Sequence, residues 1–208
     1  MQDHTRISVQ NRAQILHDIY MMHMLNTMDY LVVKKIYGYL KKESEYLPWK
    51  IALKYGISLF LYYTLDTGYW VLSLIGPVLN DLGYSTREQD KHDQISLRAE
   101  LLKIACELGD QKCRTEAEEK FKMWKESKDT NGKIPIDPNY QTTFIGIGIL
   151  SGKTSVEIEE NIKFVERRAK YEEKNIWDIQ FKRLEDSLKY YNKLEGNFNA
   201  KKMSTLIR

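Results

Sequence analysis

HDQISLRAELLKIACELGDQKCRTEAEEKFKMW, residues 92–124, is the stretch that decides the fold class. Its first half carries apolar side chains at helical spacing: Leu97, Leu101, Ile104, Ala105 and Leu108. Gly109 and Asp110 interrupt this pattern, and a second apolar stripe follows at Cys113, Ala117, Phe121 and Trp124. The stretch therefore predicts two amphipathic helices, joined by a tight turn and packed as an antiparallel hairpin.

The same periodicity extends to both sides of this stretch. Toward the N-terminus we expect helices over about 11–25, 29–41, 48–65 and 69–82, with Asn11 as the first cap and a turn at 66–68. The first helix should turn Ile15, Ile19 and Met22 inward. Toward the C-terminus we expect helices over about 139–150, from the capping box at Thr154, and from Trp177 to Tyr191. The predicted fold is all-α, with antiparallel helical hairpins forming a HEAT-like superhelix, an α-α solenoid.

The predicted domain organisation is a single helical domain over residues 1–195. A weak internal boundary is expected at 128–138, because Asn131-Gly132, Pro135 and Pro138 make this the longest loop. Residues 196–208 are expected to form a frayed tail.

Composition excludes several classes of function. A net charge of +3, with basic and acidic residues interleaved, gives no basis for nucleic-acid binding. The most apolar stretch, Ile57 to Leu79, is interrupted by Asp66-Thr67-Gly68, so no membrane span is predicted. Residues 1–10 show no signal-peptide pattern, which leaves the localisation of the chain open.

The sequence offers no pattern of residues that carries chemistry. Zinc hydrolysis requires two histidines one helical turn apart, but His4, His17, His23 and His92 form no His-Glu-x-x-His motif. A G-x-S-x-G elbow and a glycine-rich phosphate loop are also absent from the sequence. We therefore predict no catalytic residue, no metal ligand and no cofactor for this chain, and its substrate-binding residues are unknown. An independent enzyme with an unrecognised site is the least favoured hypothesis.

Two cysteines, Cys106 and Cys113, lie on the apolar stripes of the hairpin. In one continuous helix their Cα atoms would lie about 10 Å apart, too far for a disulfide. The break at Gly109-Asp110 could bring the sulfurs together. The residues alone leave both a structural disulfide and two buried thiols open.

Five segments of the chain follow one another in the order found in a known family. They are Asn11-Arg12-Ala13-Gln14-Ile15 with Asp18; Tyr39-Leu40, Glu43 and Glu45 to Leu53; Gly76-Pro77 with Leu82-Gly83-Tyr84; the 92–124 stretch; and Ile134-Pro135 with Pro138-Asn139 and an apolar helix ending at Gly152. The 92–124 stretch resembles the pattern A-C-x-x-G-x-x-x-C-x-x-x-A-x-x-x-F-x-x-W. Together the segments resemble the C-terminal helical domain of the aminopeptidase N family of zinc aminopeptidases (M1 peptidases), which includes the endoplasmic-reticulum aminopeptidases.

The resemblance implies a non-catalytic domain that covers the catalytic domain of a parent enzyme and walls the cavity holding the substrate peptide. Zinc and the G-A-M-E-N motif would then belong to the parent's catalytic domain, and the expected partners are that domain or a peptide. The resemblance also implies a Cys106–Cys113 disulfide and a parent in the secretory pathway, outside the cell or anchored to a membrane.

The chain departs from the family at two places. Gln141 stands where the family commonly has Arg, which puts an anion contact there in doubt. After Gly152 the chain resembles a shortened domain, and exposed apolar surface there would favour self-association or partner binding. The alternative to a truncated product of the parent enzyme is a free-standing helical module that binds a peptide or a protein.

Overall fold

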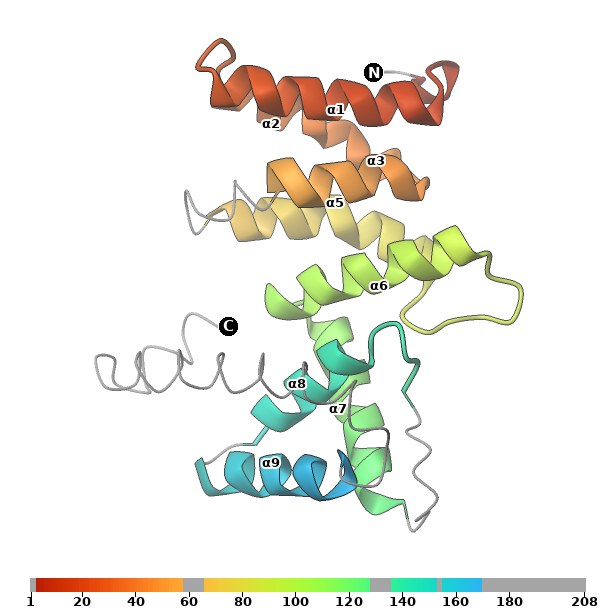
Figure 1. Cartoon of the computed structure of the whole chain (residues 1–208), viewed down its shortest axis with the longest axis vertical. Helices are drawn as coiled ribbons and strands as arrows, with labels where there is room; N and C mark the ends of the chain where they lie inside the picture. The colour runs from red at the N-terminus through yellow and green to blue at the C-terminus, as the bar shows by residue number, and fades with distance from the viewer. Residues whose placement is uncertain (1–2, 58–65, 128–135, 153–154, 170–208) are drawn as a thin grey trace. The chain divides into compact units, whose positions relative to one another are not determined.

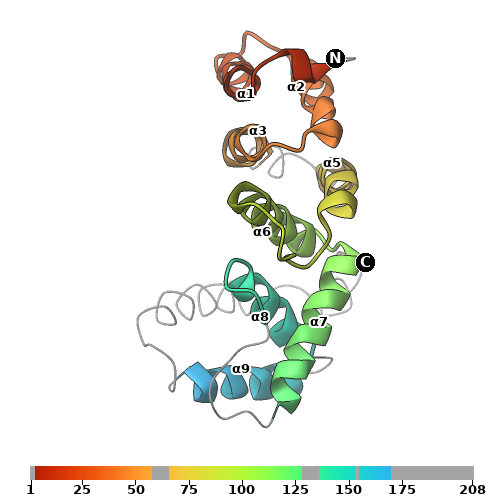
Figure 2. The ribbon, with the colours of Figure 1, turned by 90° about the vertical axis from the view of Figure 1, so that its right-hand side faces the viewer.

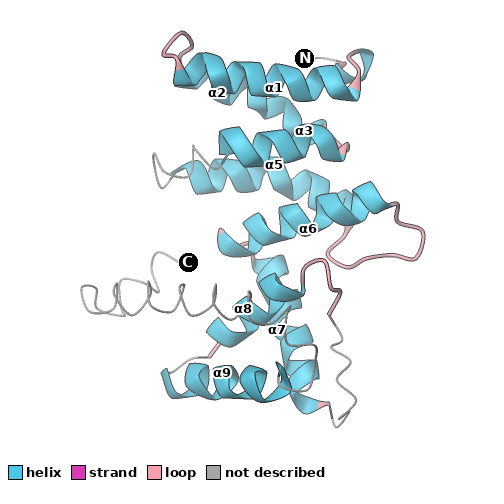
Figure 3. Cartoon of the chain, in the orientation of Figure 1, coloured by secondary structure: helices cyan, strands magenta, loops and turns pink. Residues whose placement is uncertain are grey.

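The computed structural model describes residues 3–57, 66–127, 136–152 and 155–169. All regular structure in these ranges is helical, as Figure 3 shows, which confirms the predicted all-α class. Within the same ranges, no helix is both long enough and apolar enough to cross a membrane.

The helices are short, as the sequence predicts, and loops or turns separate most of them (Figure 1). In chain order they are the 3-10 helix η1 (His4–Arg6), α1 (Val9–Met24), α2 (Tyr30–Tyr37), the 3-10 helix η2 (Gly38–Lys42), α3 (Tyr46–Ile51), the π-helix η3 (Ala52–Ile57), α5 (Asp66–Leu82), α6 (His92–Glu107), α7 (Gln111–Glu126), α8 (Gln141–Leu150) and α9 (Ser155–Ala169).

The chain divides into two compact units, Met1–Asp110 and Gln111–Arg208. Most of the boundary expected at 128–138, the helix expected from Trp177 to Tyr191 and the tail at 196–208 lie outside the described residues. The single domain over 1–195 stays a prediction.

The first unit is built from two rows of helices. In Figure 2, α1, α3 and α6 follow one another in one row, and α2 and α5 lie beside them in the other. Helix α1 contacts α2 and α3, α3 contacts α6, and α5 contacts both η2 and α6. Each hairpin therefore buries its apolar faces against the next hairpin along the chain.

A close approach between α2 and η3 fixes the core of the first unit. Tyr37 is fully buried, and its hydroxyl donates a hydrogen bond of 3.0 Å to the carbonyl of Leu16. Its ring occupies the space beside Gly56, where any Cβ atom would collide with it. The glycine is therefore required by packing, and it sits in a wide π-helical turn of the kind often found where a helix is irregular.

The second unit has an aromatic core between α7 and α9. Phe121, Trp124 and Phe164 pack edge to face, with ring centroids 4.9–6.1 Å apart. Helix α8 contacts both α7 and α9. Gly148 of α8 lies against the ring of Phe121, so the missing side chain lets α8 and α7 approach closely.

The two helices predicted in the 92–124 stretch are present as α6 and α7, with a turn at Gly109-Asp110 between them. Leu97, Leu101 and Ala105 of α6 are fully buried, and so are Cys113 and Ala117 of α7. Gly109 has a φ of 89°, a left-handed conformation that ends α6 and that glycine adopts without strain. Among the tryptophans, Trp49 and Trp124 are buried as expected.

Three details of the N-terminal prediction are wrong. Helix α1 is capped by Ser8, whose Oγ accepts a hydrogen bond from the Asn11 backbone N–H, and the cap is not Asn11. The expected turn at 66–68 is the first turn of α5, because Asp and Gly are as compatible with a helix start as with a turn. Met22 is also exposed, while Leu16 and Arg12 take the inward positions.

Candidate functional site

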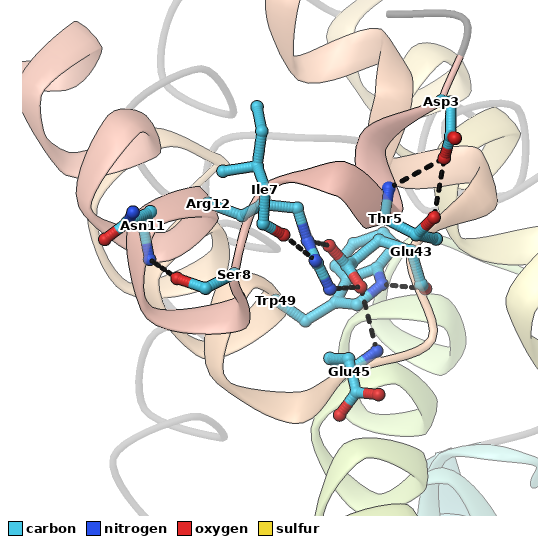
Figure 4. Close-up of polar contacts among 9 residues, drawn as sticks. All are labelled: Asp3, Thr5, Ile7, Ser8, Asn11, Arg12, Glu43, Glu45 and Trp49. Atoms are coloured by element: carbon cyan, nitrogen blue, oxygen red, sulfur yellow. Dashed lines mark hydrogen bonds and ion pairs between the residues drawn. The ribbon is translucent and has the colours of Figure 1, made fainter.

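The first two family-like segments meet in one buried ion pair, drawn in Figure 4. Arg12 of α1 donates from Nε to Oε2 of Glu43 at 2.6 Å and from Nη2 to Oε1 at 3.0 Å. Both side chains are almost completely buried. This two-pronged geometry is the strongest arrangement between a guanidinium and a carboxylate, and it joins segments 31 residues apart.

Glu43 also organises the turn between η2 and α3. Its Oε1 accepts a hydrogen bond of 3.0 Å from the backbone N–H of Glu45, and its carbonyl accepts one of 2.8 Å from Trp49 Nε1. Arg12 Nη1 donates to the carbonyl of Ile7, so the pair also holds the residue just before α1. We call Ile7, Arg12, Glu43, Glu45 and Trp49 the motif cluster (Figure 4).

The motif cluster keeps its charges in the folded state. The hydrogen bonds that Arg12 donates to Glu43 raise the pKa of the Arg12 guanidinium above its ordinary value. Burial, with the nearby Glu43 carboxylate, raises the pKa of Tyr39 well above its usual range, so this hydroxyl stays neutral. Since the hydrogen bonds of Arg12 and Glu43 join the two ions to each other and to backbone groups of Ile7 and Glu45, the cluster is suited to fixing helix positions.

A second buried arginine, Arg98 of α6, holds the loop between α5 and α6. Its Nη2 lies 2.7 Å from Asp90 Oδ2 and donates to the carbonyl of Leu82 at 2.8 Å, and its Nε donates to the carbonyl of Gly83 at 3.1 Å. Gly83, with a φ of 78°, ends α5 as predicted. Arg98 thus binds the negative end of the α5 dipole.

The environment of Asp90 favours its charged form. A hydrogen bond from the Arg87 backbone N–H and the contact with Arg98 lower the pKa of Asp90. On the same loop, burial and the neighbouring Asp110 carboxylate raise the pKa of Tyr84 to about 12. This loop is therefore anchored at Tyr84 by a neutral hydroxyl and at Asp90 by an ion pair.

The four histidines lie apart from any metal-binding arrangement in the part of the chain that the structure describes. His17 and His23 are on α1, His4 stacks near Tyr39 with centroids 5.7 Å apart, and His92 begins α6. Within the described ranges, no three His, Cys, Asp or Glu side chains are placed so that they could hold a metal ion.

Cys106 and Cys113 are both disulfide-bonded, and they are the two cysteines of the chain. The pairing that the resemblance implies is therefore present. It closes the turn at Gly109-Asp110, between the last turn of α6 and the first turn of α7. Gln141 is the first residue of α8 and is half-buried.

The buried pairings at Arg12 and Arg98 are the features that sequence reasoning missed. Each arginine occupies an inward position of its helix, Arg12 in register with Leu16 and Ile19, and Arg98 between Leu97 and Leu101. The sequence does hold a signal for these pairings, because each arginine stands at a position where helical spacing predicts an apolar residue. A buried charge without a partner is too costly to persist, so such a position implies a buried ion pair.

The sequence comparisons agree with the motif segments. The chain matches the sequence model of a family described as the ERAP1-like C-terminal domain over residues 1–177. This range includes the motif cluster, the α5–α6 loop and the disulfide.

Curated relatives carry aminopeptidase names. Over 130 residues, covering 59% of this chain, the sequence is 28% identical to glutamyl aminopeptidase of Mus musculus. It is 24% identical to glutamyl aminopeptidase of Homo sapiens over 182 residues, or 83% of this chain. Aminopeptidase N of Oryctolagus cuniculus is 29% identical over 155 residues, or 66% of this chain. The matched regions make up 13%, 18% and 15% of these relatives, so the chain spans less than a fifth of their length.

Proposed function

Because the chain belongs to the ERAP1-like C-terminal domain family, we propose that it acts as a non-catalytic domain, or a truncated product, of a zinc aminopeptidase. In this role it packs on the catalytic domain and walls the cavity that holds the substrate peptide. The single observation that carries the proposal is the family match over residues 1–177, within which Arg12 and Glu43 of two motif segments form one buried pair.

The chemistry of the chain supports a scaffolding role. The buried charges at Arg12, Glu43, Arg98 and Asp90 are used to hold helix ends and loops. Within the described ranges no three His, Cys, Asp or Glu side chains are placed to hold a metal ion. The family resemblance is what supports a zinc site in a separate catalytic domain. The helical rows of the first unit support a HEAT-like arrangement, which we propose continues through a single domain over 1–195.

Binding energy from remote parts of a substrate can be used at the reacting centre. A domain that walls a peptide cavity should therefore affect long substrates more than short ones. If the proposal is right, adding this chain to the catalytic fragment of its parent enzyme raises cleavage of a long peptide more than cleavage of a single aminoacyl fluorophore.

Reconstitution tests this directly. The chain is mixed with the parent's catalytic fragment, and the two rates are measured with the chain, with its heat-unfolded form and with an unrelated helical protein of the same size. Equal rates in all mixtures would contradict the role as a cavity wall. Copurification of the chain with a peptide or protein other than the catalytic fragment would favour the free-standing binding module.

The non-catalytic part of the proposal has its own test. The purified chain alone should release no fluorophore from aminoacyl substrates. Release that persists through further purification and that follows the chain on a sizing column would show that the chain is an enzyme.

A further inference from the structure

The turn between α1 and α2 exposes a concentration of large apolar side chains. We define the hairpin tip as residues 21–32, and its exposed apolar members are Met21, Met22, Met24, Leu25, Leu31 and Val32. Figure 1 shows the tip where the chain reverses direction at the end of the α1–α2 hairpin. Such a concentration marks an interaction surface. We propose that the hairpin tip inserts into the headgroup layer of an anionic phospholipid membrane.

The end of the tip is free of charge. Residues 21–28 contain no Asp, Glu, Lys or Arg and hold four of the seven methionines of the chain. Toward the N-terminus the next charged residue is Asp18, seven residues before Leu25, or about 10 Å along a helix. The unbranched methionine side chain adapts to an irregular apolar surface, such as the upper part of a lipid layer.

Hydrogen bonds close the backbone turn at the end of the tip. The N–H groups of Leu25, Asn26 and Thr27 donate to the carbonyls of Met21, His23 and Met22 at 2.9–3.0 Å. The ring of His23 lies 3.0 Å from the carbonyl of Met28 through Nδ1. Because an unsatisfied backbone group is costly in an apolar medium, this closed turn lowers the cost of insertion.

Asp29 is the one acidic residue of the tip. Its Oδ1 accepts a hydrogen bond of 2.7 Å from the Leu31 backbone N–H, so the carboxylate caps the positive end of α2. The cap offsets part of its charge and keeps the turn ordered.

A basic collar lies behind the apolar end. Residues 21–37 contain Lys34 and Lys35 against Asp29, a net charge of +1. Lys34 and Lys35 lie four and five residues into α2, about 6–7.5 Å behind its start. This spacing matches the depth of about 5–10 Å at which interfacial helices lie, with the lysines at the level of the lipid phosphates.

Aromatic rings lie beside the collar. The Nζ of Lys34 is 5.2 Å from the ring centroid of Trp70 and 6.0 Å from that of Tyr30. Rings with a polar edge favour the membrane interface, and lysine stems extend along such rings to place their charge in the headgroups. Along the hairpin, the apolar end is therefore followed by aromatic rings and then by lysines. The same order, from apolar to charged, is found between the acyl chains and the headgroups of a bilayer.

The charge also decides between a membrane and a second copy of the chain. Two tips packed together would bring Lys34 and Lys35 of one copy near the same lysines of the other, and this repulsion disfavours a symmetric contact. An anionic membrane attracts the same collar, at about 1 kcal/mol per lysine near the surface.

Vesicle sedimentation tests the proposal. The purified chain is mixed with vesicles of phosphatidylcholine alone, or of an equal mixture of phosphatidylcholine and phosphatidylserine. We expect it to bind the mixed vesicles and to dissociate at high salt. Leu25→Asp with Leu31→Asp should lower the partition coefficient by about tenfold or more, since these side chains are 68% and 69% exposed and free to insert. The matched control is Met123→Asp on α7, a residue that is 55% exposed and far from the tip in sequence.

A second pair of variants tests the collar. Lys34→Gln with Lys35→Gln should weaken binding by about thirtyfold, from about 1 kcal/mol for each lysine and tenfold for each 1.4 kcal/mol. Lys120→Gln with Lys122→Gln, on α7, should leave binding unchanged. In a Leu25→Trp variant the added tryptophan should shift its emission to shorter wavelength when mixed vesicles are added, while Met123→Trp should not respond.

Three results would overturn the proposal. The first is failure of the wild-type chain to sediment with the mixed vesicles, and the second is equal loss of binding in Met123→Asp and in the tip variant. The third is unchanged vesicle binding in the tip variant. If that variant loses self-association instead, the tip is the contact between two copies of the chain. Circular dichroism of each variant shows whether it is folded, and Leu25→Ser with Leu31→Ser replaces any variant that is not.

Discussion

Arg12 and Glu43 lie 31 residues apart in the chain, yet Arg12 Nε is 2.6 Å from Glu43 Oε2 and both side chains are buried. The pair connects α1 to the turn that begins α3, while Glu43 also receives hydrogen bonds from Glu45 and Trp49. Its stabilising effect depends on both partners, because either charge alone would be left in a site closed to water.

Glu43→Gln should lower the free energy of unfolding by about 3–5 kcal/mol, since it leaves the Arg12 guanidinium buried without its counter-charge. Urea unfolding followed by circular dichroism measures this loss. Glu159→Gln removes an exposed ion pair with Lys163 on α9 and should change little. Replacing both buried ions, with Arg12→Met and Glu43→Leu, should recover most of the loss. A Glu43→Gln variant as stable as the Glu159→Gln control would show that the buried pair contributes nothing.

Gly148→Ala should destabilise the second unit by about 1–3 kcal/mol, because the added methyl group collides with the Phe121 ring. Gly38→Ala is the matched control, since Gly38 has helical backbone angles where α2 meets η2, and beyond its chain neighbours no atom lies within 4 Å of the added methyl group. In that position alanine should stabilise the helix by about 1 kcal/mol. The two substitutions should therefore shift the urea midpoint in opposite directions, and a shift in the same direction would contradict the packing at Gly148.

Local periodicity accounts for the parts of this fold that sequence could predict. The stripe through Leu97 and Leu101 repeats at helical spacing, and Gly109 ends it with a conformation that glycine favours. The Cys106–Cys113 disulfide needed the family resemblance, because spacing alone left two buried thiols open as an alternative. Arg12 and Glu43 could not be paired from periodicity, since their contact depends on how two hairpins pack.

The N-terminal errors have a related cause. Asp66 and Gly68 are turn residues by composition, but the first turn of a helix accepts both of them. Met22 follows the spacing of Ile15 and Ile19, and yet it points outward because the hairpin ends there. Helical spacing predicts which residues are buried only along the part of a helix that a neighbouring helix covers.

Asp90→Asn should reduce the acid sensitivity of the first unit. The folded-state pKa of Asp90 lies below its ordinary value of 3.8, owing to the Arg87 backbone N–H and to Arg98, so the unfolded chain binds the proton more readily. Its contribution to stability is therefore present above pH 3.8 and is lost as the pH falls from there through the lower, folded pKa. Urea midpoints measured across this pH range should fall less steeply in the variant. Asp93→Asn, at the exposed start of α6, is the control, and equal slopes for the two variants would contradict the role of Asp90.

Reduction of the Cys106–Cys113 disulfide should lower the free energy of unfolding by about 2–3 kcal/mol, the value expected for closing a loop of this length in the unfolded chain. Urea unfolding with and without a reducing agent measures the effect, and the variant with Cys106→Ser and Cys113→Ser should show no dependence on the agent. Because both cysteines are buried on the apolar stripes of α6 and α7, the reduced protein should remain helical and lose stability before it loses structure. Thiol titration of the unreduced, urea-unfolded chain provides the decisive control: two reactive thiols would show that the bond does not form, and the predicted dependence on reductant would then disappear.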